Sequence, residues 1–390
     1  MKTQAKAILR KKEDRRIRSG HLWIFSNELN RIEGAPSNGD LIEVVDHSDH
    51  PVGIGYWNGN SLIAVRMLSR KPPDSLEELV RARLSKANEF RGSVSYENTY
   101  RLLFGESDFL PGLVIDRYND VFVLESFSAG ADRIIPIAVE WLQDTFSPKC
   151  IFEKSDSQWR SYEGLEARTG FLLGNDGATT ATIRDMSYII NVLDAQKTGL
   201  FLDQRENRLL VEAISRGKHV LDCFCNDGGF ALHAARGGAL SAVGLDISAD
   251  AIQRAGANAN INRLPGIDFR VADVFESLNA QIKDNYDMII LDPPAFVRSK
   301  NRLASGLKGY QKLNERAMWL LPEAGILVTC SCSQHVSEDV FLDMLKRSAR
   351  SQNKYLKIFA VRGAALDHPV LASMPETQYL TFVAATVHSL

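Results

Sequence analysis

The chain has 390 residues, of which 45% are hydrophobic and 24% charged, and its formal net charge is −2 at pH 7. This length is typical of two or three domains, and the composition excludes collagen, coiled coil and intrinsic disorder. The balanced charge disfavours a general nucleic-acid-binding protein, because such proteins usually carry a basic surplus. It does not exclude local basic patches.

The sequence predicts a cytoplasmic protein with free thiols. It has no apolar run long enough to span a membrane, and its basic N-terminus lacks the apolar stretch of a signal peptide. Four of the five cysteines form two Cys-x-Cys pairs, Cys223/Cys225 and Cys330/Cys332. Structural zinc sites usually separate paired cysteines by two to four residues, so we expect no metal site.

The first elements in chain order predict a small β-barrel over residues 1–72. Residues 1–20 carry eight Lys or Arg against two acidic residues, a net charge of +6. Three short β-type runs then follow at residues 41–46, 51–57 and 61–67, separated by turn formers. Strands this short and this closely spaced are typical of a barrel.

Residues 73–188 predict a small α+β domain. Ser75 and Glu78 form a capping-box pattern that begins a helix. Strands are expected at residues 113–116, 121–126 and 150–153, with a further helix around residues 134–146.

Residues 189–390 predict a doubly wound α/β domain. Short apolar runs alternate with helical stretches, which is typical of a parallel sheet covered on both faces. The expected strands are residues 219–222, 241–246, 267–272, 288–291 and 325–330. In such folds ligands bind outside the carboxyl ends of the strands.

Acidic residues at three strand ends predict an adenosine site without a phosphate site. Asp222 ends the first strand, and Gly228-Gly229 follows it in place of the G-x-G-x-x-G phosphate loop. Asp246 could accept hydrogen bonds from ribose hydroxyls, and Asp273 could meet an adenine amino group. This pattern suits S-adenosylmethionine (SAM), whose sulfonium is favoured by nearby acids and by aromatic faces such as Phe224. For each acid alone, the cap of the following helix is an equally good interpretation.

The last two strand ends carry candidate reactive groups. Asp292 precedes Pro293-Pro294, a step that fixes an extended backbone and has no N–H to offer. Cys332 follows the fifth strand and is a candidate nucleophile.

These motifs resemble the large-subunit rRNA cytosine-5 methyltransferase family, which implies an N-terminal PUA barrel, a small middle domain and a class I methyltransferase domain. The resemblance covers essentially the whole chain. It rests on the ordered strand ends, on Ser331-Cys332-Ser333, and on three further stretches: residues 196–205 (QKTGLFLDQR), Gly105-Glu106-Ser107-Asp108 with Leu110-Pro111-Gly112, and Asp367-His368-Pro369-Val370.

The resemblance implies a covalent mechanism in which Cys332 adds to carbon 6 of cytosine and Asp292 holds the base. Many RNA cytosine-5 enzymes carry a second Cys directly after the Asp-x-Pro step, and here that position is Ala295, so the base that releases the product is open. The implied cofactor contacts are Gln204, Asp222, Phe224, Asn226, Asp227, Gly228, Gly229, Phe230, Asp246, Ile247, Asp273, Val274, Asp292 and Pro293.

RNA contacts are expected in two basic zones. The first zone is the basic N-terminus, and the second is residues 297–316, which have a net charge of +5. The candidate side chains are Arg15, Arg16, Arg18, Arg298, Lys300 and Lys308. A solvated helix face is the alternative interpretation of residues 308–316. The expected partner is large-subunit rRNA or a ribosomal assembly particle rather than a membrane, and dimerisation is left open.

Two other functions remain open from the sequence. An RNA nitrogen methyltransferase of the guanine N7 type could use the same scaffold without a nucleophilic Cys. A non-catalytic ribosome-assembly or RNA-binding factor could retain the fold, although the intact set of four acids disfavours it.

Overall fold

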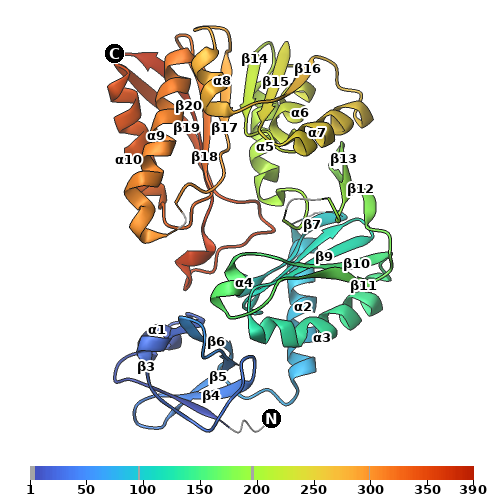
Figure 1. The fold of residues 1–390 in the computed structure, drawn as a ribbon, viewed down its shortest axis with the longest axis vertical. Coiled ribbons are helices and arrows are strands. Elements are labelled where there is room, and N and C mark those ends of the chain that lie inside the picture. The colour runs from blue at the N-terminus through green and yellow to red at the C-terminus, as the bar shows by residue number, and fades with distance from the viewer. Residues whose placement is uncertain (1–4, 95–96, 195–196, 298) are drawn as a thin grey trace. The chain divides into compact units, whose positions relative to one another are not determined.

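The computed structural model describes residues 5–94, 97–194, 197–297 and 299–390, apart from the side chain of Lys300. The chain forms two compact units (Figure 1). The first comprises Met1–Asp185, Ile190–Leu200 and Leu366–Thr377, and the second comprises Met186–Ile189, Phe201–Ala365 and Gln378–Leu390. The division into three domains at residues 72 and 188 stays a prediction.

The first 70 residues form a six-stranded sheet with the order β2-β6-β5-β4-β1-β3. The predicted strands at 41–46 and 51–57 are confirmed, and the third begins two residues later than predicted. Three strands and a helix in residues 6–33 were not predicted, because their apolar runs are short. The elements are β1 (Lys6–Leu9), α1 (Asp14–Arg18), β2 (Trp23–Phe25), η1 (Ser26–Glu28), β3 (Leu29–Glu33), β4 (Leu41–Val45), β5 (Pro51–Trp57) and β6 (Ile63–Ser69).

The middle of the chain forms a five-stranded sheet, β11-β10-β9-β8-β7, whose core includes residues of α2 and α3. Ser75 caps α2 as predicted, because its side chain accepts a hydrogen bond from the Glu78 N–H. Ser128 caps α3, so that helix begins five residues earlier than predicted. The elements are α2 (Leu76–Ser93), β7 (Thr99–Phe104), η2 (Gly105–Asp108), β8 (Leu113–Tyr118), β9 (Val121–Ser126), α3 (Ala129–Phe146), β10 (Cys150–Ser155), α4 (Trp159–Tyr162), β11 (Arg168–Leu173), β12 (Ala178–Ile183) and β13 (Met186–Asn191).

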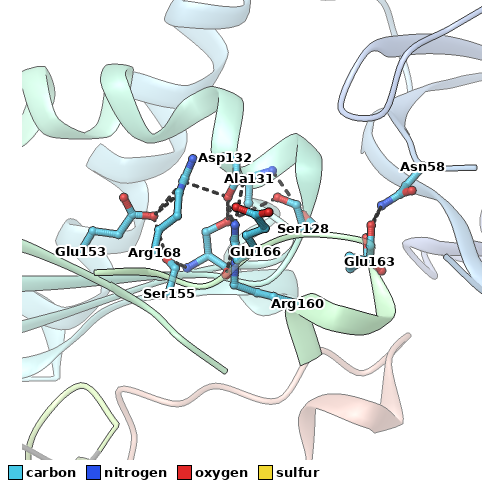
Figure 2. Close-up of polar contacts among 11 residues, drawn as sticks. Asn58, Ser128, Ala131, Asp132, Glu153, Ser155, Arg160, Glu163, Glu166 and Arg168 are labelled. Carbon is cyan, nitrogen blue, oxygen red and sulfur yellow. Dashed lines mark hydrogen bonds and ion pairs between the residues drawn. The ribbon is translucent and has the colours of Figure 1, made fainter. Parts of the chain in front are cut away.

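The single turn of α4 is held by two buried charged side chains, Arg160 and Glu163 (Figure 2). Arg160 donates to Asp132 Oδ1 at 2.9 Å and to the backbone oxygen of Glu166 at 2.8 Å. The Glu163 carboxylate accepts hydrogen bonds from two guanidinium nitrogens of Arg66, at 2.9 and 3.0 Å, and from the amide nitrogen of Asn58 at 2.9 Å. Glu163 therefore joins the six-stranded sheet to the middle of the chain by a bidentate ion pair with nearly all of its area buried.

Replacement of Glu163 by alanine should destabilise the first unit strongly. The Arg66 guanidinium, 9% exposed, would be left buried without its carboxylate. Breaking such a pair from one side typically costs about 3–5 kcal/mol. Urea unfolding measures the loss, and Glu166→Ala is the matched control because that glutamate is exposed. A loss below about 1 kcal/mol would contradict a structural role for the pair.

The segment Leu366–Thr377, here called the return segment, leaves the C-terminal part of the chain and packs within the first unit. The carboxylate of Asp367, fully buried, accepts the Arg101 N–H at 2.8 Å. Its backbone oxygen accepts from Arg91 at 2.8 Å, and Arg91 also pairs with Asp108 at 2.7 Å. Two of the sequence motifs, Gly105–Asp108 and Asp367–Val370, thus meet in one buried ionic cluster.

The return segment also completes the core of the six-stranded sheet. Met374 is fully buried in that core, and Leu371 packs against it. Ser373 donates to the backbone oxygen of Gly20 at 2.9 Å. Residues more than 300 positions apart in the chain therefore share one hydrophobic core.

The second unit is built on a seven-stranded sheet with the order β16-β15-β14-β17-β18-β20-β19. The five predicted strands are confirmed to within one residue at their ends. These five strands are parallel to one another as predicted, and two strands that were not predicted extend the sheet, with β20 antiparallel to both β18 and β19. The elements are η3 (Leu202–Gln204), α5 (Arg205–Ile214), β14 (His219–Cys223), α6 (Gly229–Arg236), β15 (Ser241–Asp246), α7 (Ala249–Ile261), β16 (Ile267–Val271), α8 (Val274–Ala280), β17 (Met288–Leu291), η4 (Lys300–Arg302), α9 (Leu303–Leu320), β18 (Gly325–Ser331), α10 (Glu338–Ser351), β19 (Lys354–Arg362) and β20 (Thr381–Ser389). The short helix η5 (Pro375–Thr377) lies in the return segment and belongs to the first unit.

Both faces of this sheet are buried. Leu221, Ile289 and Leu327 point into a core with α8, α9 and α10, whereas Val220 and Val328 point into a second core with α5 and α6. Successive side chains of a strand alternate between its faces, which explains why these strands are apolar without interruption. Among the helices of the described residues, none is both long and apolar enough to cross a membrane.

Candidate functional site

The acidic residues predicted at the strand ends of the second unit lie at one edge of its sheet. In the parallel register, Cys223 of β14 is paired with Leu245 of β15 and Leu291 of β17. Asp246 and Asp292 come directly after those two partners, and the Asp292 N–H donates to the Cys223 oxygen at 3.3 Å. The carboxyl ends of three neighbouring strands therefore converge, as the sequence predicted.

The loop after β14 follows an unusual left-handed path. Phe224 has a φ of 63°, Asn226 of 46° and Gly228 of 82°. The Asn226 N–H donates to Asp246 Oδ2 at 3.0 Å, and Asp227 receives Arg254 Nε at 2.7 Å. These contacts fix the loop between β14 and α6 against the end of β15.

Asp222 is fully buried beneath this loop. Its Oδ2 accepts the Ala231 N–H of α6 at 2.9 Å, whereas its Oδ1 has no hydrogen-bond partner among the described residues. Burial raises the pKa of Asp222 to about 8, and the nearby Asp292 and Asp246 carboxylates add to the rise. A buried carboxyl oxygen without a partner is suited to a hydrogen-bonding group of a ligand at this edge.

The remaining predicted cofactor contacts divide between the surface and the core. Ile247, directly after Asp246, is 72% exposed, and Asp273 is exposed and caps α8 through the Glu276 N–H at 3.0 Å. Val274 is buried against the sheet, and Phe230 is buried beside Phe382. The helix-cap interpretation of Asp273 is thus realised, while its carboxylate stays accessible.

These residues fit SAM better than a dinucleotide. The edge carries three acids, and one buried oxygen of Asp222 has no hydrogen-bond partner among the described residues. A Cβ at Gly228 would lie 2.7 Å from Phe269 Cζ, so the backbone there has no room for a side chain. Asp222, Asp246 and Asp273 with the Phe224–Phe230 loop would hold the cofactor. In the described part of the chain, no group of three or more His, Cys, Asp or Glu side chains is arranged to hold a metal ion.

Alanine at position 228 should raise the dissociation constant for SAM at least about tenfold, since the left-handed backbone costs roughly 1–2 kcal/mol for a residue with a Cβ and the loop must also move away from Phe269. Isothermal titration calorimetry measures the affinity. Gly256→Ala is the matched control, because a Cβ there meets nothing within 4 Å. Unchanged SAM affinity in the Gly228 variant would argue against this loop as the cofactor site.

The raised pKa of Asp222 predicts a pH dependence of stability. An unfolded aspartate has a pKa near ~3.9, so the folded state holds an extra proton between about pH 4 and about pH 8. The free energy of unfolding should therefore fall as pH rises through this range. Urea unfolding at several pH values, compared with Asp222→Asn, measures the difference. A difference that does not change with pH would show that Asp222 is ionised in the folded protein.

The predicted reactive groups stand beside the acidic edge. Cys332, at the end of β18, is half-buried, and its thiol donates to the Pro293 oxygen at 3.7 Å. The other four cysteines are buried, and burial raises the pKa of each of those thiols. Gln204, which the sequence assigned to the cofactor, donates to both carboxylate oxygens of Asp292 at 3.2 Å.

A buried hydroxyl pair next to Cys332 was missed by the sequence analysis. The Tyr310 hydroxyl lies 2.9 Å from Ser333 Oγ, which also accepts the Val297 N–H at 3.2 Å. Burial raises the pKa of Tyr310 to about 12, so its hydroxyl stays protonated. This pair fixes the segment after Pro294 against the end of β18. The only signal in the sequence was that Tyr310 is an aromatic residue within the basic stretch 297–316.

The predicted RNA-binding residues have different surroundings. Arg15 is exposed, whereas Arg16 pairs with Glu28 at 2.8 Å and Arg18 pairs with both Asp14 and Asp46. Lys308 is exposed on α9. Arg298 and the side chain of Lys300 lie outside the described residues. Part of the positive charge counted in the sequence is therefore engaged in internal ion pairs.

Comparison with known proteins supports the two domain types. A family model for a PUA-like domain matches residues 7–70, and one for S-adenosylmethionine-dependent methyltransferases matches residues 164–359. Proteins of Shewanella frigidimarina and Aeromonas hydrophila, each named ribosomal RNA large subunit methyltransferase I, are 36% and 35% identical to the chain. Each alignment covers 96% of this chain, and 97% and 98% of those proteins. The chain belongs to the ribosomal RNA large subunit methyltransferase I family.

Solved structures agree with this family fold. A methyltransferase complexed with SAH (S-adenosylhomocysteine) matches 98% of the chain with a TM-score of 0.84 and 20% identity. A SAM-dependent methyltransferase from Streptococcus mutans matches with a TM-score of 0.82 and 19% identity. The family models and relatives show a SAM-dependent methyltransferase with an N-terminal PUA-like domain, as the sequence predicted, and the solved structures share its fold.

Proposed function

We propose that this chain transfers a methyl group from SAM to carbon 5 of cytosine in large-subunit ribosomal RNA. The observation that carries this proposal is the position of Cys332, a half-buried thiol beside the Asp292-Pro293 step. The names of the curated relatives supply the substrate class. The PUA-like domain and the exposed cations Arg15 and Lys308 support contact with RNA phosphates.

Cytosine carbon 5 is a poor nucleophile, and the chain's own residues can activate it. The thiolate of Cys332 forms a bond to carbon 6, which shifts electron density to carbon 5. Asp292 accepts hydrogen bonds from the amino group and the protonated ring nitrogen of the base, which stabilises the adduct. SAM, when bound, supplies an electrophilic methyl group. Loss of the carbon 5 proton to a base re-forms the carbon 5–carbon 6 double bond, breaks the carbon 6–sulfur bond and releases Cys332 as the thiolate.

The target cytosine must leave its helical stack to reach this edge. Enzymes that act on a base in RNA take it from a single strand or flip it out. The rigid Pro293-Pro294 step and the buried Tyr310–Ser333 contact hold one wall against which such a base can lie. The substrate is therefore expected to be an unpaired or easily opened cytosine.

Ala295 favours a second candidate, an RNA nitrogen methyltransferase, since the second cysteine found in many cytosine-5 enzymes is absent. A nitrogen has its own lone pair and needs no thiol addition, so such an enzyme would use Asp292 and Pro293 while Cys332 stayed idle.

Mass mapping of ribosomal RNA tests the proposal. RNA from cells that lack this chain should lose one 5-methylcytosine, which the wild-type chain restores and Cys332→Ser does not. Unchanged cytosine methylation in the deletion would refute the substrate. Restoration of a lost methyl group by Cys332→Ser would instead support the nitrogen methyltransferase, and a chain that binds no SAM would support the assembly factor.

A further inference from the structure

Two buried amide side chains connect Asp292 to the backbone of a distant loop in the second unit. Gln204 is 2% exposed and Asn207 is 1% exposed. Gln204 Nε2 lies 3.2 Å from each Asp292 oxygen, and its Oε1 accepts from Asn207 Nδ2 at 2.7 Å. Asn207 Nδ2 also donates to the backbone oxygen of Gly363 at 3.2 Å.

The direction of these hydrogen bonds is fixed from one end. A backbone oxygen such as that of Gly363 can only accept, so the Asn207 amide must present its nitrogen. Both protons of that nitrogen are then used, one on Gly363 and one on Gln204 Oε1. Gln204 must in turn present its nitrogen to Asp292. Reversal of either amide would bring two acceptors together, so each buried amide has a single favourable orientation.

We propose that Gln204, held by Asn207, is a positioning residue that fixes the carboxylate of Asp292 for the substrate base. This inference rests on the proposed function, in which Asp292 receives the base. It gives Gln204 a different role from the cofactor contact that the sequence suggested.

The chemistry of an amide suits this role. A carboxylate beside the fully buried Asp222 needs a donor that holds it in one rotamer. Arginine or lysine would supply that donor but would also neutralise the charge that the base must use. Gln204 donates without a formal charge, so Asp292 keeps its negative charge for the activated base.

Gln204→Leu tests the proposal, because leucine fills a similar volume and removes both donors. We expect kcat for methyl transfer to fall roughly 10- to 100-fold. The dissociation constant for SAM and the KM for RNA should stay close to wild type, and the melting temperature should fall only by a few degrees, because the buried Asn207 amide loses its acceptor. Asn207→Leu should reproduce part of this loss. Gln352→Leu is the control, since that glutamine is only partly buried at the end of α10 and its amide donates to a serine hydroxyl.

Gln204→Glu gives a readout that a merely structural role would not move. Two carboxylates about 3.2 Å apart share one proton, and the protonated glutamate can donate to Asp292 as the amide does. The kcat of this variant should fall with rising pH as the shared proton is lost. The titratable groups that face the pair are Asp222, Asp203, Cys330 and Cys332, and they are present in both proteins.

Three results would overturn the proposal: a kcat within about twofold of wild type in Gln204→Leu, a loss of SAM affinity in place of kcat, or a pH profile of Gln204→Glu that matches wild type. Failure of the proposed function is recognised separately. If Cys332→Ser keeps its activity, the reaction is not cytosine-5 methylation. The kcat of the Gln204 variants for the product that is then formed still decides whether Gln204 positions Asp292.

Discussion

Replacement of Cys332 by serine should lower kcat roughly 10⁴-fold or more while leaving SAM affinity unchanged. A serine hydroxyl is a far weaker nucleophile at neutral pH than a thiolate, so the bond to carbon 6 would not form. Single-turnover methylation of an rRNA fragment measures the rate, and calorimetry measures SAM binding. The half-buried position of the thiol makes a large effect on folding unexpected.

The same reaction offers a direct test of the covalent step. RNA with 5-fluorocytosine at the target position has no proton to release at carbon 5, so the enzyme should remain attached to it in the presence of SAM. The adduct should appear as a retarded band with the wild type and be absent with Cys332→Ser. Cys330→Ala is the matched control, since that thiol is fully buried two residues away. An adduct formed by Cys332→Ser would exclude Cys332 as the nucleophile.

Replacement of Asp292 by asparagine should lower kcat about 10³-fold. The amide removes the negative charge that the adduct needs, and its NH₂ group is a donor in place of one of the two oxygens that accept from Gln204. Steady-state methylation gives kcat and KM, and a thermal melt reports on folding. Asp268→Asn is the control, because that aspartate is exposed and pairs only with Arg270 in the described structure. A kcat within about tenfold of wild type would remove Asp292 from the reaction.

Local patterns explain why much of the second unit could be predicted. Strands β15 and β17 match their predicted limits because apolar runs between turn-forming residues need no tertiary information. The convergence of Asp222, Asp246 and Asp292 follows from parallel strand order alone. By contrast, β19 alternates exposed residues with partly buried ones, and its antiparallel pairing with β20 depends on residues that no local period reveals.

Contacts between distant residues set the limit of the sequence prediction. The hydrogen bonds from Gln204 to Asp292 span 88 positions, and the bond from Arg91 to the Asp367 backbone spans 276. Neither partner is unusual in its own neighbourhood. The basic N-terminal zone shows the same limit, since a charge count treats Arg16 and Arg18 as available although both are engaged with carboxylates.

The return segment has a consequence for the order in which the protein can mature on the ribosome. N-terminal domains usually fold first as a chain is synthesised. Here Met374 belongs to the core formed by the first 70 residues, and Asp367 belongs to the cluster around Arg91. Neither the core nor the cluster can be completed until residues 367–374 have left the exit tunnel. The first unit would then gain its final stability only after the second unit has been synthesised, so a product truncated before residue 366 should be unstable and readily degraded.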